Sequence, residues 1–391
     1  MVTSEKLLPV HKRFNISFSH GEGVYLYSNE DKYLDFGAGI AVNALGHCHP
    51  KLVEALTNQA KKLWHVSNIY NGNELNNYAE KLVNNCCADY VFFCNSGAEA
   101  VECAIKMIRR YFYVSGFKEK NRIITFTGAF HGRTIATISA AGKEKYLEGF
   151  RPALEGFDNV EFGNIEAVKK AITNKTAAIL IEPIQGEEGI RVASKEFLQE
   201  LRALCDKNSL LLAFDEVQCG MGRTGNLNAH KYFDIEPDIT SVAKAIGGGY
   251  PLGACLAKKE AAKGMTYGVH GTTYGGNPLA MSVANAVLDV MLSEGFLENV
   301  KRVSEILIRG LKNLKDSYPD KIVEVRGVGL MIGLKLADKI ENLKFVEKLI
   351  ENRLLTVGAS ENVVRILPPL IINDEHVKEA LDKIEKTLIN F

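Results

Sequence analysis

The chain has 391 residues, of which 46% are hydrophobic and 24% are charged, and these values exclude a disordered, collagen-like or coiled-coil protein. Its 47 Lys and Arg residues balance 47 Asp and Glu residues, so no net charge favours binding to nucleic acid or to an anionic membrane. At about 150 residues per domain, this length predicts roughly two to three domain-sized units. We therefore expect a folded protein that acts on a small, near-neutral metabolite.

The amino-terminal segment and the cysteines both indicate the cytosol. Residues 1–20 contain no sustained apolar stretch, so we expect neither a signal peptide nor a membrane-spanning helix. The 8 cysteines form no CxxC pair, and in a chain of this length we expect them to be reduced. Cys48 lies between His47 and His49, but adjacent residues of an extended chain point in opposite directions and no second ligand cluster follows. We therefore expect no metal site.

In chain order, the first expected element is a hairpin over residues 25–36, with its turn at residues 29–31. Beyond about residue 85, short β-branched or aromatic runs alternate with helical patterns, which is typical of a mostly parallel sheet covered by helices. The expected strands span residues 90–94, 122–127, 177–181, 210–214 and 239–242.

Helices are expected where apolar residues recur every three or four positions. The first is marked by Val101, Ala104, Ile105, Ile108 and Phe112. The second is marked by Phe197, Leu201, Leu204 and Cys205, and a last one by apolar residues at 377, 380, 381, 384 and 388. Residues 321–336 predict an antiparallel pair bent at Gly327 and Gly329.

These elements predict an α/β fold with a mostly parallel central sheet and a smaller α+β domain. We place the large domain at residues 51–290 and build the small domain from both termini, residues 1–50 and 291–391. A cleft between two domains is the default place for a binding site.

A glycine pattern raises an alternative function. Gly220, Gly222 and Gly225 fit GxGxxG directly after an apolar strand, which would suit a nicotinamide-dependent oxidoreductase. A dinucleotide-binding loop must open onto a helix, yet residues 226–233 show no convincing helical apolar face, and the Asp215 carboxylate would stand close to any phosphate. We interpret the loop as a flexible turn and keep the oxidoreductase as an alternative.

Two charged residues that follow predicted strands indicate a function more specifically than the glycine pattern does. Asp215 stands at the carboxyl end of an apolar strand, where α/β proteins place ligand-binding groups. Lys244 lies among small and apolar residues ahead of three glycines, and desolvation favours the neutral, nucleophilic amine. Taken singly, most lysines are surface groups and most such aspartates are helix caps. A non-enzymatic scaffold, a further alternative, would be expected to have lost one of the two.

Seven ordered segments carry a resemblance to a known family. They read GHCHP, NSGAEA, AFHGRT, EPIQGE, FDEVQ, KAIGGG and HGTTYGGNP, at residues 46–50, 95–100, 129–134, 182–187, 214–218, 244–249 and 270–278. The chain resembles, over nearly its whole length, the class III pyridoxal-phosphate-dependent aminotransferases of the aspartate aminotransferase fold, which is PLP fold type I.

The resemblance implies a role for each cofactor-binding residue. Lys244 would hold pyridoxal 5′-phosphate covalently and move the substrate proton, and Asp215 would pair with the pyridine nitrogen. Backbone N–H groups of a helix-capping turn would hold the phosphate. The remaining cofactor-binding positions are Ser96, Gly97 and Ala98 in that turn, Phe130 and Val217 on the ring faces, Gln218 at the phenolic oxygen, and Thr273 at the phosphate of the neighbouring subunit. The resemblance therefore also implies a homodimer with shared active sites.

Two arginines would bind substrate carboxylates, because guanidinium captures a planar carboxylate in a bidentate manner. Arg133 matches the position that binds the carboxylate remote from the reacting amine, and Arg365 the position that binds the α-carboxylate of 2-oxoglutarate. Glu187 matches the switchable partner of Arg365, although a surface salt bridge is the simpler interpretation.

One position favours a particular amino donor. Family members specific for ornithine carry a tyrosine that binds the free α-amino group, and Ile40 stands at the aligned position here. An apolar group there suits an α-nitrogen that is acylated or absent. The expected reaction is transfer of the δ-amino group of N2-acetyl-L-ornithine to 2-oxoglutarate, giving glutamate, in arginine biosynthesis. Ornithine, 4-aminobutyrate and N-succinyl-diaminopimelate remain alternative donors.

Overall fold

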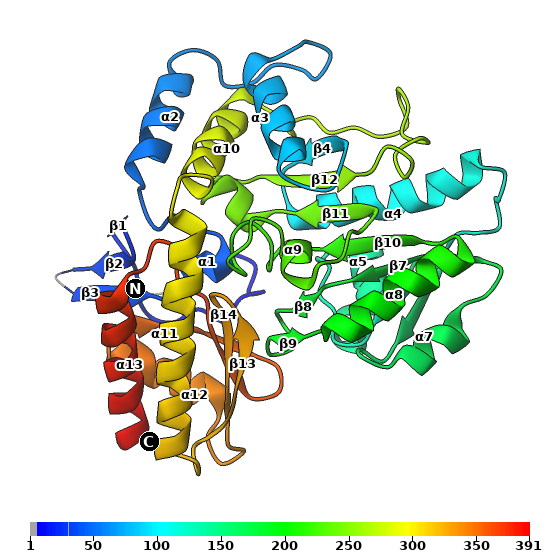
Figure 1. The fold of residues 1–391 in the computed structure, drawn as a ribbon. Helices are drawn as coiled ribbons and strands as arrows, with labels where there is room; N and C mark the ends of the chain where they lie inside the picture. Colours follow the sequence, from blue (N-terminus) through cyan, green and yellow to red (C-terminus); the bar gives the residue numbers. More distant parts are fainter. Residues whose placement is uncertain (1–5, 30) are drawn as a thin grey trace.

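A sheet of seven strands forms the centre of the molecule in the computed structural model, which describes residues 6–29 and 31–391 (Figure 1). Its order is β4-β12-β11-β10-β7-β5-β6, and every neighbouring pair is parallel except those made by β12. The strands are β4 (Tyr90–Cys94), β5 (Arg122–Phe126), β6 (Phe157–Val160), β7 (Thr176–Ile181), β10 (Leu211–Asp215), β11 (Ile239–Val242) and β12 (Gly253–Ala257). This confirms the predicted α/β fold with a mostly parallel sheet.

All five predicted strands of this sheet are present within a residue or so, whereas β6 and β12 were not predicted. β12 reads GACLA, and its small residues carry little strand propensity. It is a strand because β11 and β4 pair with it on both sides. β6 reads FDNV, in which Asp and Asn are residue types depleted in strands.

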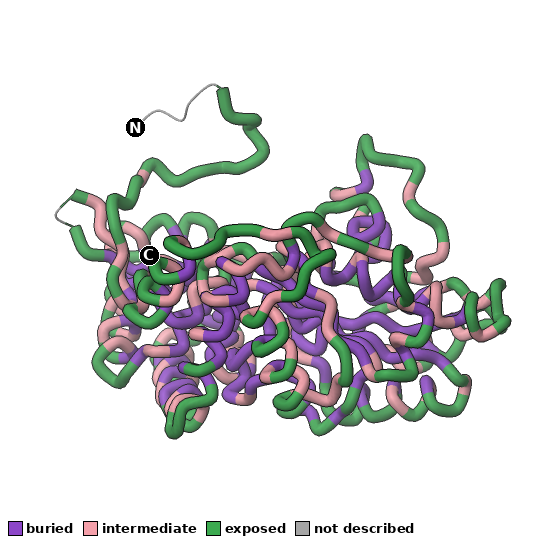
Figure 2. The backbone as a smooth tube through the Cα atoms, turned by 90° about the horizontal axis from the view of Figure 1, so that it is seen from above, coloured by how far each residue is buried: buried purple, intermediate pink, exposed green. Residues whose placement is uncertain are grey.

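Helices cover both faces of the sheet. Successive residues of β7 alternate between the two layers: Ala178 and Leu180 pack with α4 residues, whereas Ile179 and Ile181 pack with α8 residues. The covering helices are α4 (Gly97–Val114), α5 (Ile135–Ala141), α6 (Glu144–Leu147), α7 (Ile165–Ala171) and α8 (Lys195–Asn208). α4 and α8 confirm the two helices predicted between strands, and Figure 2 shows buried chain in the interior of the molecule with exposed chain around it.

A second sheet, of order β1-β2-β3-β15, combines strands from the amino-terminal part of the chain with one from the carboxyl-terminal part. It consists of β1 (His20–Glu22), β2 (Tyr25–Ser28), β3 (Asp31–Asp35) and β15 (Leu354–Leu355). β2 and β3 confirm the predicted hairpin, although Glu30 of its turn lies outside the described residues. β15 pairs parallel with β3 and so joins the two ends of the sequence.

A third sheet of order β13-β14-β17-β16 confirms the predicted antiparallel pair. Gly327 has a φ of 136° and Gly329 a φ of 59°, values that favour glycine at the predicted bend. The strands are β13 (Ile322–Val328), β14 (Met331–Leu336), β16 (Val357–Ala359) and β17 (Val363–Ile366). α11 (Phe296–Ser317), α12 (Asn342–Glu351) and α13 (Asp374–Ile389) lie beside it, and α13 confirms the predicted last helix (Figure 1).

The remaining elements connect these layers. They are α1 (Ala38–Ala41), α2 (Pro50–Ala60), α3 (Asn73–Asn84), α9 (Ala229–Phe233), α10 (Pro278–Met291), the 3₁₀ turn η1 (Lys244–Gly247), β8 (Ile184–Gln185) and β9 (Arg191–Val192). No single helix of the described chain is long and apolar enough to cross a membrane; α10 and α11 meet the length and hydropathy criteria only as a pair bent by 68°. The domain limits at residues 50 and 290 stay a prediction.

Candidate active site

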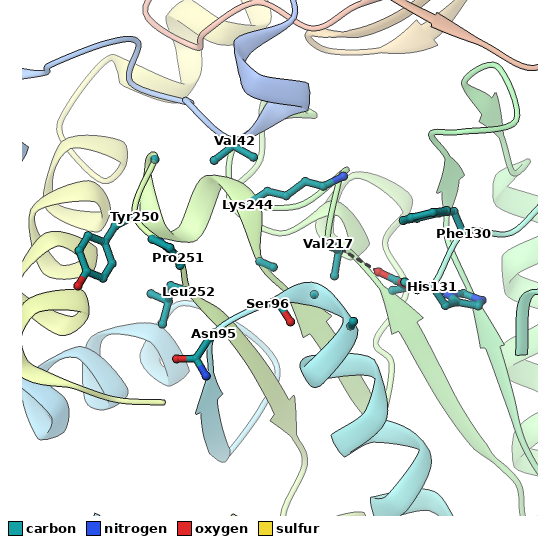
Figure 3. A pocket seen from close by; sticks show the side chains of 16 residues that line it. Val42, Asn95, Ser96, Phe130, His131, Val217, Lys244, Tyr250, Pro251 and Leu252 are labelled. Carbon is teal, nitrogen blue, oxygen red and sulfur yellow. Dashed lines mark hydrogen bonds and ion pairs between the residues drawn. The ribbon is translucent and has the colours of Figure 1, made fainter. Parts of the chain in front are cut away.

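The carboxyl ends of β4, β5, β10 and β11 surround a cavity of about 340 Å³ (Figure 3). Parallel strands end at the same edge of a sheet, so the side chains that follow them converge there. Of the residues predicted to bind the cofactor, those that line the cavity are Ser96, Gly97, Ala98, Phe130, Asp215, Val217 and Lys244.

Lys244 opens η1 directly after β11, with a φ of 51°. A non-glycine residue in this left-handed region is uncommon and is associated with functional sites. Its side chain extends across the cavity toward the side where Val217 and Phe130 lie (Figure 3). Burial, and then the positive charge of Arg365, lower the pKa of Lys244 to about 8, so that far more of the amine is neutral near neutral pH than in a lysine with an ordinary pKa.

Asp215 ends β10 and is held by two contacts. Its Oδ2 lies 2.7 Å from Nδ1 of His131, and its Oδ1 accepts a hydrogen bond of 3.0 Å from the backbone N–H of Val217. Burial alone lowers the pKa of His131, but the hydrogen bond to Asp215 and the charges of Asp215 and Glu182 outweigh it and raise this pKa. His131 therefore holds the carboxylate in a fixed orientation toward the cavity.

Glu182 completes this buried group. Its Oε2 accepts a hydrogen bond of 2.8 Å from the backbone N–H of Phe130, which orients the Phe130 residue at the cavity wall. Burial, and then the charge of Asp215, raise the pKa of Glu182 to about 7. His131 and Glu182 were not among the predicted site residues, although both lie in the segments that carry the resemblance. Their position could have indicated them, because Glu182 directly follows the predicted strand 177–181 and His131 lies in the loop after the predicted strand 122–127.

The amino terminus of α4 faces the same cavity. Ser96 is its N-cap, and its Oγ accepts from the N–H of Glu99 at 3.3 Å and donates to the Glu99 carboxylate at 3.0 Å. A Cβ at Gly97 would lie 2.7 Å from Val217 Cγ1, so only glycine lets α4 begin this close to β10. Free N–H groups at a helix amino terminus, with the helix dipole, bind anions such as phosphate.

Two predicted cofactor residues do not line the cavity. Gln218 is buried beneath it, and its Oε1 has no hydrogen-bond partner among the described residues. Thr273 is exposed, on the segment ahead of α10, and is absent from the cavity of its own chain.

The predicted substrate residues lie around the cavity rather than in its wall. Arg133 is exposed, with its guanidinium 3.9 Å from the ring centre of Tyr146 and 5.5 Å from that of Phe130. Arg365 is buried, and its Nη1 lies 2.7 Å from Oε1 of Glu187. The predicted contact between Glu187 and Arg365 is therefore present.

Ile40 lies in α1, a left-handed turn that leads to Val42 in the cavity wall. Its φ is 63°, and a β-branched residue rarely adopts such a conformation. The carboxylate of Asp35 fixes the entry to the turn by accepting bonds of 2.9 Å from the N–H groups of Gly37 and Ala38. Ile40 is 41% exposed, so its apolar side chain is available to a ligand.

The glycine loop does not form a dinucleotide site. A short helix, α9, does follow it, but the Glu216 carboxylate accepts hydrogen bonds from the N–H groups of Ala229 and His230 at 2.6 and 2.8 Å. That helix terminus is therefore already occupied by an anion of the chain itself. Across the described residues no group of three or more His, Cys, Asp or Glu could hold a metal ion, and the cysteines there are unpaired.

Comparison with known proteins gives a consistent assignment. The family model for aminotransferase class-III matches residues 9–388. The chain is 57% identical to the acetylornithine aminotransferase of Agrobacterium fabrum over 380 residues, covering 97% of this chain and 95% of that protein. Among solved structures, N-acetylornithine aminotransferase from Stenotrophomonas maltophilia is 38% identical with a TM-score of 0.85, and covers 96% of each chain. An ornithine aminotransferase from Toxoplasma gondii, with partial occupancy of PLP at its active site, is 29% identical with a TM-score of 0.95, and covers 99% of this chain and 92% of its own.

The chain belongs to the class-III aminotransferases. It is a transaminase of PLP fold type I that uses pyridoxal 5′-phosphate, which confirms the predicted fold, enzyme class and cofactor and removes the oxidoreductase and scaffold alternatives.

The residues present fit this cofactor. The α4 terminus offers N–H groups to a phosphate, Asp215 offers a fixed carboxylate to a ring nitrogen, and Lys244 offers an amine of lowered pKa to an aldehyde. The unpartnered Oε1 of buried Gln218 can accept a hydrogen bond from a polar group of the ring, because buried polar atoms normally have a partner.

Proposed function

We propose that the enzyme transfers the δ-amino group of N2-acetyl-L-ornithine to 2-oxoglutarate, giving N-acetyl-L-glutamate 5-semialdehyde and L-glutamate, as a step of arginine biosynthesis. The observation that carries this proposal is the 57% identity, over nearly the whole chain, to a protein named acetylornithine aminotransferase. The apolar Ile40 beside the cavity supplies a physical reason, since it offers no hydrogen-bond partner to a free α-ammonium group.

Lys244 is proposed to hold the cofactor and to move the proton at the substrate carbon. Bound pyridoxal phosphate supplies an electron sink that stabilises negative charge on that carbon. Asp215 keeps the ring nitrogen protonated by its negative charge, and His131 holds Asp215 in place through the 2.7 Å contact. A pKa of about 8 suits Lys244 to both accepting and releasing a proton near neutral pH.

The remaining cofactor contacts are assigned by the same proposal. Gly97 and Ala98 donate backbone N–H groups to the phosphate at the terminus capped by Ser96, while Phe130 and Val217 cover the two ring faces. Gln218 is assigned to a hydrogen bond with the phenolic oxygen.

The subunit arrangement is part of the proposal. Thr273 lies outside its own cavity, so we assign it to the phosphate of a second subunit in a homodimer with shared active sites. Large exposed side chains support an interface, among them Trp64 at 66% and Tyr267 at 102% exposure. The unpaired cysteines support a reducing, cytoplasmic location. We retain residues 51–290 as the large domain and 1–50 with 291–391 as the small one.

Two arginines divide the carboxylate binding. Arg133 is proposed to bind the α-carboxylate of acetylornithine, and Arg365 that of 2-oxoglutarate. Glu187 neutralises Arg365 during the amine half-reaction and moves aside for the dicarboxylate; at 28% side-chain exposure it has room to move, whereas Arg365 at 2% does not.

Comparison of four donors at fixed 2-oxoglutarate tests the substrate assignment. Acetylornithine should exceed ornithine in kcat/KM by roughly a hundredfold, since burying an ammonium without a partner costs a few kcal/mol. 4-Aminobutyrate and N-succinyl-diaminopimelate should also react more slowly. If one of these proved the best donor, the proposed substrate would be wrong while the family assignment would stand.

The Ile40→Tyr variant tests the reason for that preference. A hydroxyl at this position should raise kcat/KM for ornithine and lower it for acetylornithine, so that the ratio falls by roughly tenfold or more. Val53→Tyr changes another exposed apolar residue outside the cavity and serves as the control, with an unchanged ratio. An Ile40→Tyr enzyme with the original ratio would contradict the role of Ile40.

A further inference from the structure

Arg223, in the glycine loop, is among the largest fully buried side chains, and it has no ion-pair partner within residues 6–29 and 31–391. It is 1% exposed, and burial lowers its pKa to about 9 with no carboxylate close enough to offset this among the described residues. Its Nη1 donates to the backbone carbonyl oxygens of Leu330, at 3.2 Å, and Pro368. Its Nε and Nη2 have no partner within the described chain. A buried, unpaired cation is costly, so stability alone does not account for an arginine here.

The loop that carries Arg223 is fixed at one end to β10, the strand that carries Asp215. The loop follows β10, and the N–H of Gly220 donates to the carbonyl of Glu216 at 2.9 Å. The Glu216 carboxylate is in turn held by α9, as described above. Gly222 has a φ of 87°, which glycine adopts without strain and which lets the chain turn sharply just ahead of Arg223. Arg223 therefore starts from a rigid extension of the strand that carries Asp215.

Arg223 itself contacts the chain next to β14 and β17, the paired strands near Arg365. The N–H of Leu330 donates to the carbonyl of Arg223 at 2.9 Å, so the β13–β14 turn and the loop bond to each other in both directions. A Cβ at Gly329 would lie 2.4 Å from the Arg223 carbonyl oxygen, which shows how closely they approach. Pro368 follows β17, the strand that carries Arg365 and pairs with β14.

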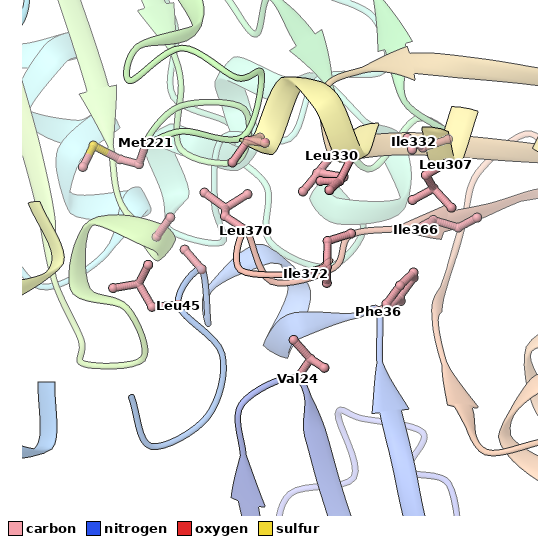
Figure 4. Packing of buried hydrophobic residues seen from close by; sticks show 14 of the residues in the cluster. Val24, Phe36, Leu45, Met221, Leu307, Leu330, Ile332, Ile366, Leu370 and Ile372 are labelled. Atoms are coloured by element: carbon pink, nitrogen blue, oxygen red, sulfur yellow. The ribbon is translucent and has the colours of Figure 1, made fainter. Parts of the chain in front are cut away.

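Arg223 is 1% exposed, and apolar residues of the segments that it connects belong to one buried cluster. Met221 of the loop, Leu330 of the turn and Leu370 of the segment after β17 lie in this cluster (Figure 4). Water is therefore excluded, and the carbonyl contacts of Arg223 are stronger than they would be in solvent. Both bonds come from Nη1, whose two N–H groups have directions fixed by the guanidinium plane, whereas the amine of a lysine ends a flexible stem and has no such fixed directions.

We propose that Arg223 is a positioning residue that sets the place of Arg365 relative to the cofactor. Its hydrogen bonds connect the loop after β10 to the β13–β14 turn and to Pro368, which follows the strand that carries Arg365. The inference rests on the proposed role of Arg365 in binding the dicarboxylate. It predicts that Arg223 affects binding of the dicarboxylate acceptor and not of the cofactor. Lys244 follows β11 and the phosphate terminus belongs to α4, and Asp215 is held by its own contacts with His131 and Val217.

Calorimetric binding of glutarate to the pyridoxal-phosphate-loaded protein tests this inference. Glutarate has the two carboxylates of 2-oxoglutarate and no reactive group. R223K should raise the Kd for glutarate by roughly tenfold or more, since a misplacement of about 1 Å at a binding group can cost up to about a hundredfold in affinity or rate. The KM for 2-oxoglutarate should rise in parallel, while the visible absorbance of bound cofactor and the rate of the donor half-reaction stay near those of the unaltered enzyme.

R109K is the matched control. Arg109 also donates to a backbone carbonyl, that of Glu155 at 2.8 Å, and has a buried Nε without a partner among the described residues, but it lies on α4 away from the cavity. Its glutarate affinity should not change. R223Q, which is neutral but keeps an N–H donor, carries the same expectation as R223K if the lysine variant does not fold.

The outcomes separate this inference from the proposed function. If R365K weakens glutarate binding and R223K only lowers the Tm, Arg223 is structural and the inference is overturned. If R365K binds glutarate as tightly as the unaltered enzyme, Arg365 is not the carboxylate site, and the proposed role of Arg365 and the inference are both wrong.

Discussion

At the scale of single residues, the chemistry of Lys244 depends on charges that come from distant parts of the sequence. Arg365 lowers its pKa, whereas Glu187, Glu182 and Asp215 raise it, and burial exceeds all of them. The pair proposed to bind the acceptor substrate therefore also changes the pKa of the amine proposed to do the chemistry. When Glu187 moves away from Arg365, the balance of charge around Lys244 changes with it.

Incorporation of pyridoxal phosphate into the cofactor-free protein should become faster as the pH rises through about 8. The lysine must be neutral to attack the aldehyde, and its folded-state pKa of about 8 lies below its ordinary value, so the neutral fraction reaches one half near that pH. A lysine with an ordinary pKa of about 10.4 would still be gaining rate above pH 9. Visible absorbance after mixing gives the rate.

Two variants should shift this midpoint in opposite directions. Arg365→Gln removes a charge that lowers the pKa of Lys244, so its midpoint should move to higher pH. Glu187→Gln removes a charge that raises it, so its midpoint should move to lower pH. A midpoint that moves the same way in both would show that these charges do not act on Lys244.

At the scale of elements, the site is made by strand ends and one helix terminus. β4, β5, β10 and β11 each deliver a residue to the cavity from the segment at or just beyond their carboxyl ends. Because the side chains come from neighbouring parallel strands, their spacing is set by the sheet. The proposed phosphate site depends instead on how the first turn of α4 is held.

Replacement of Ser96 by alanine should loosen that turn and weaken cofactor binding. Loss of an N-cap costs about 0.5–2 kcal/mol, and the N–H groups of Gly97 and Ala98 lose their alignment. Ser194→Ala is a matched control, because Ser194 caps α8 in the same way, accepting from the N–H of Phe197 at 3.1 Å, away from the cavity. Both variants should lower the Tm by a similar amount, but only Ser96→Ala should release pyridoxal phosphate faster on dilution. Equal release rates would show that the cap serves stability alone.

At the scale of the whole molecule, the small sheets place the substrate arginine and the left-handed turn over a site built by the large sheet. Leu367 and Leu370, in the segment after β17, donate to the carbonyls of Phe36 and Ala44 at 2.7 and 2.6 Å, on either side of the Ile40 turn. The amino- and carboxyl-terminal parts of the chain therefore hold together Ile40, the proposed donor-specificity residue, and Arg365, the proposed acceptor arginine.

Mixed dimers test the proposed sharing of active sites. Lys244→Ala and Thr273→Asp should each be inactive alone, the first for lack of the amine and the second because its carboxylate repels the phosphate. If each site takes Lys244 from one subunit and Thr273 from the other, one site of every mixed dimer has both native residues. Subunit exchange at equal amounts should then restore about a quarter of the normal activity, because about half the dimers are mixed and half of their sites are intact. A mixture as inactive as its components would contradict shared sites.

The sequence by itself determined most strands and helices of the central layers and the reactive side chains that follow the strands. Alternating and helical apolar patterns are local properties, so they located β4, β10, α4 and α8, and they placed Asp215 and Lys244 after strands. The resemblance then supplied roles for residues such as Phe130 and Arg133.

Only the tertiary structure decided what depends on contacts between distant segments. β12 is a strand because its neighbours pair with it, and His131 matters because folding brings it to Asp215, 84 positions away in sequence. The Glu187–Arg365 contact spans 178 positions, and Arg223 meets Pro368 across 145. Such contacts are set by how the sheets pack against one another, and no local pattern of polarity records a partner so far along the chain.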